Sequence, residues 1–301
     1  MIQFVPNEHE PFLSGIALLF PYLRLMQASN AYITGHLSVP PEWQNIFDPF
    51  YFIHNHSSSP VTKILSPTFQ TILVFNFSSP GLFFVEENMP VTIDKSMVIG
   101  PIKLAHQYTI PAHGEMLVAN FKRDAFYRFF GKHLQSYTDF LLHPDEILGE
   151  HCFAAFWETL KAFNSMQERV DAILDFSAVY LRERDKGSEE IITAGETDGA
   201  INPIKDIADK QGQSERNIQL KHKKYLGYNA KEMNRYQRFQ KALTRLQVQA
   251  ENGNIDWFEL IHEGGYYDQS HLIHDFNHFL GLSPAQFLKL QSTVCIAGGR
   301  S

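Results

Sequence analysis

The sequence predicts an α+β protein of two domains: an N-terminal β-barrel or jelly roll with flanking helices, and an all-helical C-terminal domain. Its 301 residues exceed what a single hydrophobic core usually serves. Short apolar and alternating runs fill the chain up to about residue 135, and helical periodicity dominates after about residue 200. We therefore expect a first domain over residues 1–185, a linker over 186–200, and a helical domain over 201–292.

The first domain is expected to contain short strands followed by helices. Turn-forming residues separate six runs of strand character, at residues 50–53, 71–77, 81–85, 91–93, 97–99 and 116–121. Strands of this length and spacing indicate a small barrel or jelly roll. Between residues 122 and 183, apolar stripes at helical spacing predict helices that either complete the core or form a dimer interface.

Residues 265–288 are the most informative segment of the helical domain. A tight turn at Gly265 and a polar N-cap region at residues 268–270 precede a core-facing stripe, made by Leu272, Ile273, Phe276, Phe279 and Leu280. Gly281 is placed to end this helix, and Pro284 cannot continue it. Two helices joined by a tight turn form a helix-turn-helix, whose second helix can enter the DNA major groove.

The helical domain repeats this pattern at an offset of 54 residues. The segment from Tyr225 to Ala230 aligns with the segment from Phe279 to Pro284, and Ile218 aligns with Leu272. Upstream, Ile204, Ile207 and Ala208 indicate another helix, followed by a turn and an N-cap at residues 212–214. We therefore predict two helix-turn-helix units, joined by a long helix over about residues 230–250.

These residues closely resemble the DNA-binding domain of the AraC/XylS family of transcription regulators. The turn, Tyr-Tyr-Asp-Gln-Ser-His, Phe276 and Gly-Leu-Ser-Pro stand in the family order, and the resemblance covers about residues 200–290. The segments 98–101 and 117–121 are also similar to the cupin-like sensor domains that part of this family carries. The resemblance implies a sequence-specific regulator that reads the major groove with two helices, at about residues 214–225 and 268–280.

The resemblance also implies which side chains contact DNA, namely Ser214, Arg216, Gln219, Lys221, Lys223 and Lys224 in the first unit, and Gln269, Ser270, His271 and His274 in the second. Arginine pairs with guanine and glutamine with adenine, whereas the lysines suit phosphates. Two positions depart from the family pattern. Leu220 stands where arginine is usual, and His222 stands where the family packs phenylalanine; we expect a buried, hydrogen-bonded histidine there.

Charge is distributed unevenly between the two units. The whole chain has a net charge of −7, but most of the excess acid lies before residue 196. Residues 203–245 hold eleven basic and four acidic residues, a net charge of +7, whereas residues 246–288 hold six acidic residues and no lysine or arginine. Because phosphate neutralisation supplies most DNA affinity, we expect the first unit to bind more strongly. Protonation of His271, His274 and His278 is one hypothesis for a pH-dependent contact in the second unit.

The N-terminal domain shows a weak metal-binding pattern. His54 and His56 would face the same side of a strand, as a cupin metal site requires, but the glutamate expected a few residues later is missing. His106, His113 and Glu115 do not stand in that family's order. We therefore expect no metal, no cofactor and no catalytic residue. A metal-dependent barrel enzyme fused to a DNA-binding tail remains an alternative, as does a protein-interaction module with a degenerate second unit.

An effector pocket in the barrel would be lined by aliphatic and aromatic side chains; the candidates are Phe52, Phe69, Leu73, Phe75, Phe77, Phe83 and Phe84, most of which must be core. No apolar run reaches the roughly 18–20 residues that span a bilayer. Two cysteines make no disulfide framework, which favours a reducing, cytoplasmic setting. The expected partners are double-stranded DNA, a small-molecule effector, a second copy of the chain, and RNA polymerase if the protein is an activator.

Overall fold

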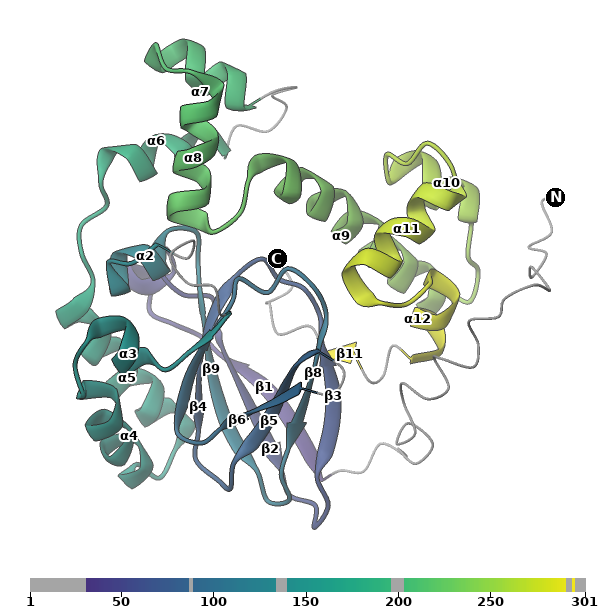
Figure 1. Cartoon of the computed structure of the whole chain (residues 1–301). Helices are drawn as coiled ribbons and strands as arrows, with labels where there is room; N and C mark the ends of the chain where they lie inside the picture. The colour runs from purple at the N-terminus through teal and green to yellow at the C-terminus, as the bar shows by residue number, and fades with distance from the viewer. Residues whose placement is uncertain (1–30, 87–88, 134–139, 196–202, 291–293, 296–301) are drawn as a thin grey trace.

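The computed structural model describes residues 31–86, 89–133, 140–195, 203–290 and 294–295. It is a mixed structure, with antiparallel sheets in the N-terminal part and helices in the C-terminal part, as the sequence predicts (Figure 1). Within the described segments, no helix combines the length and apolar character needed to cross a membrane.

The strands in the described part of the chain form two sheets. The six-stranded sheet has the order β1 (Tyr32–Leu37), β2 (Phe50–Asn55), β9 (Glu115–Phe121), β4 (Thr71–Asn76), β7 (Ser96–Ile99) and β10 (Leu141–Leu142). The five-stranded sheet has the order β11 (Val294–Cys295), β3 (Val61–Leu65), β8 (His106–Ile110), β5 (Gly81–Glu86) and β6 (Met89–Ile93). Neighbouring strands are antiparallel, except that β11 pairs with β3 in parallel, which returns the end of the chain to the sheets.

One buried cluster lies between the two sheets, and a larger one lies on the outer face of the six-stranded sheet. Alternation along β4 separates them: Ile72 and Val74 face the other sheet, whereas Leu73 and Phe75 face the helices. Those helices are α2 (Ala125–Phe130), α3 (Pro144–Leu148), α4 (Cys152–Ala162) and α5 (Met166–Tyr180), and a short 3-10 turn, η1 (Pro41–Trp43), precedes β2. The flanking helices therefore complete a core.

All six runs expected to be strands are strands, but β1, β3, β8 and the two-residue strands β10 and β11 were not anticipated. The sequences of β3 and β8, Val-Thr-Lys-Ile-Leu and His-Gln-Tyr-Thr-Ile, are short and rich in polar residues. Thr62 and Thr109 lie on the exposed side of the sheet and pair across the two strands at 2.8 Å. Such half-polar strands give a weaker apolar signal than the strands of the six-stranded sheet.

Residues 186–195, which the sequence analysis expects to be linker, form helix α6 (Lys186–Gly195). The buried Asp124 holds its start, because Arg184 and the hydroxyl of Ser188 both donate to this carboxylate. Ile191 is also buried, against Tyr225 of the helical part. Residues 186–195 therefore belong to a packed helix, and the rest of the expected linker, residues 196–200, lies outside the described residues.

The described residues of the C-terminal part form six helices: α7 (Pro203–Gln211), α8 (Glu215–Leu226), α9 (Ala230–Glu251), α10 (Trp257–Glu263), α11 (Gln269–Leu280) and α12 (Pro284–Leu290). We call α7 and α8 the first helical pair, and α10 and α11 the second. Their second helices have matching ends. Ser214 and Asp268 cap α8 and α11, and Gly227 and Gly281 end them with φ of 79° and 67°.

Candidate nucleic-acid interface

Helix α8 begins at a turn that presents its first residues to solvent. Gly212 takes a φ of 61°, which favours glycine, and the side chain of Ser214 accepts a hydrogen bond from the backbone N–H of Asn217. Ser214 therefore caps the helix. Arg216 and Gln219 follow on its exposed side.

A surface groove of about 570 Å³ lies between α8 and the start of α9. Its lining includes three cations, Arg216, Lys223 and Lys231, and one acidic residue, Glu215; the other lining residues are Ile204, Gln219, Leu220, Asn229, Ala230 and Asn234. Cations and amides of this kind bind phosphates and base edges. Arg216, Gln219 and Lys223 were expected from the sequence, whereas Lys231 and Asn234 were not, because they belong to the next helix.

Lys221 and Lys224 lie on a different side of α8. The ammonium of Lys221 is 3.3 Å from Glu190 of α6. Lys224 donates to the hydroxyl of Tyr225 at 3.1 Å and lies 5.4 Å from the ring centre of Tyr127 in α2. Both side chains thus contact neighbouring parts of this chain, outside the groove that contains Lys223.

The expected contact residues of the second pair lie in the first turns of α11. Gln269 is half-buried, and Ser270 is exposed. His274 is well exposed, with 72% of its side-chain surface open to solvent, while His271 is half-buried. The backbone N–H of His271 donates to the Asp268 cap at 2.8 Å.

Helix α9 supplies positive charge to the second pair, although residues 246–288 have none of their own. Arg235 and Arg238 reach across to α11, where they donate to the two carboxylate oxygens of Asp275 at 2.7 and 2.8 Å. Asp275 is fully buried. Burial disfavours its charge, but the hydrogen bonds from Arg238 and Arg235 outweigh burial and hold the pKa of Asp275 below its ordinary value.

The same arginines contact the expected histidines. Arg235 donates to Nδ1 of His274 at 3.1 Å, and Arg238 donates to Nε2 of His271 at 3.2 Å. A guanidinium only donates hydrogen bonds, so each of these ring nitrogens accepts in these contacts. Burial and the charge of Arg235 also lower the pKa of His278. The pH-dependent contact set made of the three histidines stays a prediction.

His222 lies half-buried in α8, where the repeat and the family place an aromatic residue. Burial lowers its pKa to about 4, so the ring is neutral at neutral pH. Among the described residues, none forms a hydrogen bond with its buried Nδ1. The sequence analysis expects a buried and hydrogen-bonded histidine; the burial is found, and the hydrogen bond at Nδ1 is not.

The space between the two sheets is small. Its cavity has a volume of about 40 Å³, against the roughly 300–1,000 Å³ of common ligand pockets. Of the seven expected lining residues, Phe83 alone borders this cavity. Phe52, Leu73, Phe75 and Phe77 belong to the cluster under helices α2–α5, because alternate positions of a strand face opposite sides. Phe69 packs in the C-terminal part, and the half-buried Phe84 follows Phe83 on the other face of β5.

His54 also faces the helices and not the space between the sheets. Its Nε2 lies 3.3 Å from Glu115, whose carboxylate is in turn 3.0 Å from the guanidinium of Arg169. Burial lowers the pKa of His54, and the adjacent Glu115 opposes that shift. His56 is exposed in the following turn. Across the described segments, no three His, Cys, Asp or Glu side chains gather closely enough to hold a metal ion.

Comparisons with known proteins give distant structural similarity only. No protein-family model matches the sequence, and no curated protein is significantly similar to it. ToxT from Vibrio cholerae O395 has a TM-score of 0.38 and 12% identity over 87% of this chain and 98% of its own. Unsaturated fatty acid-bound ToxT has a TM-score of 0.37 and 11% identity over 88% and 97%. An RmlC-like cupin protein from Desulfovibrio desulfuricans has a TM-score of 0.25 and 11% identity over 33% and 91%. Similarity this low assigns no residue a role.

Proposed function

We propose that this chain is a sequence-specific DNA-binding transcription regulator of the AraC/XylS type and not an enzyme. In this proposal the two helical pairs are helix-turn-helix units, and α8 and α11 are their recognition helices. The N-terminal domain is a cupin-like barrel that mediates effector sensing, dimerisation or both. RNA polymerase is a further partner if the protein activates transcription.

The groove beside α8 is the observation that carries the proposal. Arg216 and Gln219 are exposed near the start of a capped helix, where a side chain can reach base edges. Lys223 and Lys231 border the same groove and are placed to neutralise phosphates. Long donors for bases and cations for the backbone are the two kinds of contact that sequence-specific DNA binding requires.

In the second unit, we propose that Arg235 and Arg238 make the phosphate contacts and that Gln269, Ser270 and His274 lie nearest the bases. Each arginine keeps donors that Asp275 and the histidines do not use, and about 30% of each side chain is exposed. The second unit is therefore less acidic at its DNA-facing side than its own sequence suggests. Its affinity still depends on two arginines that already have a carboxylate partner.

Capture of host genomic fragments by the full-length protein at near-physiological salt tests the proposal. We expect a shared site with two half-sites about one helical turn apart. Arg216→Ala should relax the preference at one base pair by about 1–3 kcal/mol. Lys161→Ala removes an exposed cation from α4 and should recover the parental site. Capture of random fragments, or of none, by the parent protein would contradict the proposal.

A protein-interaction module is the second candidate, and one observation favours it. The second unit exposes two large aromatic side chains, Phe258 at 64% and Tyr267 at 93%. Acidic Glu259 and Glu263 lie on the same short helix as Phe258. If salt titration shows that DNA binding disappears at near-physiological salt, this second candidate becomes the better account.

A further inference from the structure

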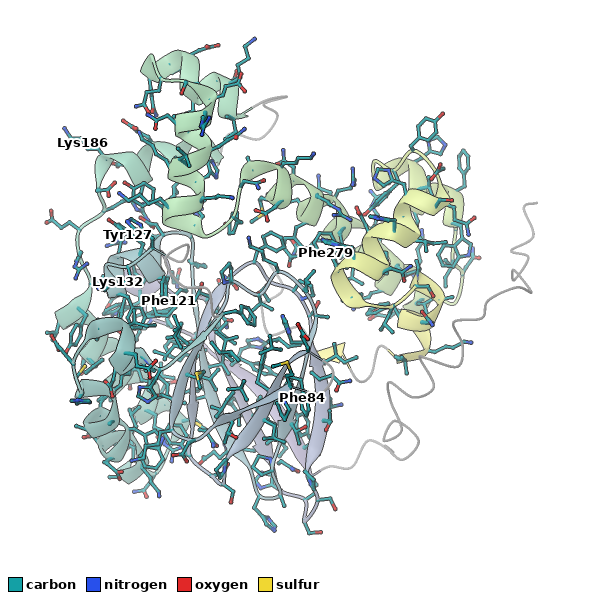
Figure 2. All side chains as sticks on the ribbon, viewed as in Figure 1. Phe84, Phe121, Tyr127, Lys132, Lys186 and Phe279 are labelled. Atoms are coloured by element: carbon teal, nitrogen blue, oxygen red, sulfur yellow. The ribbon has the colours of Figure 1, made fainter. Side chains whose placement is uncertain are left out.

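The two helical pairs contact the N-terminal part of the chain at separate places. Tyr225 of α8 meets Tyr127 of α2, with ring centres 5.0 Å apart, and Phe279 of α11 lies near the loops at the ends of the sheets. In Figure 2, the labels Tyr127 and Phe279 mark these places on opposite sides of the upper edge of the sheets. Each pair therefore has its own attachment to the N-terminal part.

Helix α9 joins the pairs but packs mainly with the second of them. Its five buried residues all belong to the core of the second pair: Tyr236, Phe239, Ala242, Leu243 and Leu246. The small core of the first pair includes a single residue of α9, Ala230 at its start. Packing within the C-terminal part therefore ties α9 to α11 much more firmly than to α8.

Phe69 attaches the second pair to the sheets. This residue lies in the loop between β3 and β4, has a φ of 58°, and is only 5% exposed. Its ring stacks on Tyr236 of α9, with centres 4.3 Å apart and planes at 17°, and meets the edge of Phe279. The hydroxyl of Tyr236 donates to the carbonyl of Pro67 at 2.6 Å. A positive φ is costly for phenylalanine, so the surrounding contacts must hold this conformation.

A neighbouring loop adds to this attachment. The backbone N–H of Ala105 donates to the carbonyl of Phe279 at 2.8 Å, in the last turn of α11, and Lys103 pairs with Glu232 of α9 at 3.2 Å. The two loops are joined to each other, because the carbonyl of Ile102 accepts hydrogen bonds from the N–H groups of Thr68 and Phe69. The loops thus form one surface against which α9 and α11 pack.

We infer that Phe69 is a positioning residue for DNA binding: it fixes α11 relative to α8 and so determines which spacing of half-sites the protein accepts. This inference rests on the proposed function. A helix of 22 residues such as α9 is about 33 Å long, close to the roughly 34 Å of one DNA turn, so it permits contact with adjacent turns. The contacts of each unit with the N-terminal part then fix the orientation of the second unit relative to the first.

The test compares the full-length parent with Phe69→Ala on DNA duplexes whose half-site spacing varies by up to about five base pairs, roughly half a helical turn. The parent should prefer one spacing by about tenfold, because the second contact is intramolecular only when the geometry fits. Phe69→Ala should lose most of that preference while binding to the α8 half-site alone stays within about twofold. An unchanged spacing profile, or an equal loss on the single half-site, would overturn the inference.

A DNA-independent readout separates this inference from the proposed function. Hydrogen exchange at the Ala105 amide should accelerate in Phe69→Ala, while amides in the middle of α11 stay protected. Tyr236→Phe keeps the stacked ring and loses both hydrogen bonds of the hydroxyl, the one it donates to Pro67 and the one it accepts from Gln240. It should fold normally and shift the spacing profile less than Phe69→Ala. If the parent binds no DNA, the proposed function fails; unchanged Ala105 exchange would overturn the attachment by itself. Phe156→Ala, a similar truncation beneath α5, is the control that should change neither readout.

Discussion

The second helices of the two pairs begin and end with matching residues, but the pairs differ in packing and in charge. Ile218 and Leu272, 54 residues apart, are both buried at the same point of the repeat. At the next core position the first pair has the half-buried His222, and the second has Phe276, which is 1% exposed. The first pair has a small aliphatic core, whereas aromatic rings dominate the core of the second.

The first pair has the smaller core but the more accessible positive charge. The first pair presents Arg216 and Lys223 in an open groove, and the second depends on Arg235 and Arg238, which a buried carboxylate already binds. Under the proposed function, this difference implies a division between the two units: the first supplies most of the DNA affinity, and the second holds a fixed position. Three predictions test this division, beginning with the largest expected effect.

Replacing Asp275 with asparagine should damage the second unit most. The variant leaves two guanidinium groups without their buried counter-charge. We expect the free energy of unfolding to fall by about 3 kcal/mol at pH 7. This is the lower end for a buried pair, because both arginines remain partly in water. The pKa of Asp275 is lowered by folding, so its contribution is complete above the ordinary value of 3.8 and disappears as the pH falls through the folded value.

Urea unfolding of Asp275→Asn at pH 7 and at pH 3 measures this contribution. The exposed Asp171→Asn on α5 is the matched control, with an expected change below about 0.5 kcal/mol. Equal stability of the parent and Asp275→Asn at pH 7 would show that the ion pairs do not stabilise the second unit.

His222→Phe should make the first unit resemble the second. Because folding lowers the pKa of His222 from 6.5 to about 4, the unfolded chain is protonated first, and the folded state loses stability as the pH falls from 6.5 towards 4. Between pH 7 and pH 5 this loss is about 2 kcal/mol for the parent. The phenylalanine variant should lack that part of the pH dependence, which urea unfolding at pH 7 and pH 5 measures. If both proteins lose equal stability over this range, burial of a neutral His222 does not destabilise the first unit at low pH.

Lys223→Ala and Lys221→Ala should separate the two sides of α8. Lys223 borders the groove, so its loss should weaken DNA binding by about 1 kcal/mol and reduce the salt dependence by about one phosphate contact. Lys221 pairs with Glu190, and its loss should leave the salt dependence unchanged. Fluorescence anisotropy at several salt concentrations measures both, and an equal effect of the two changes would mean that α8 meets DNA with a different face.

Local patterns predicted much of the fold and part of the site. The cap at Asp268, the stripe from Leu272 to Leu280 and the ending at Gly281 define α11 as the structure has it. The six strands found from the sequence also follow local alternation. Arg216, Gln219 and Lys223 were identified by a resemblance within a single helix, and the structure brings them to one groove.

The pairings between distant segments could not be predicted in this way. Residues 186–195 have few apolar side chains, and their helix depends on the buried Asp124, 64 positions before Ser188. The net charge of residues 246–288 does not include Arg235 and Arg238, which belong to α9. In the folded chain both arginines lie beside α11, because they donate to the carboxylate of Asp275. The position of His54 also depends on distant segments. Its ring lies beside Glu115, which pairs with Arg169, on the face of the sheet that the helices cover.

By itself, the sequence determined the helical domain's capped helices and six of the strands, because caps, turns and periodic apolar residues act over a few positions. Tertiary structure alone decided which faces are free. In the folded chain, Lys221 and Lys224 contact Glu190 and Tyr225, and the arginines of α9 lie beside the second unit. Phe69 packs in the core beside Tyr236 and does not line the expected pocket. The physical reason is that burial and ion pairing depend on distances in space, and a single sequence does not record which remote side chain will meet another.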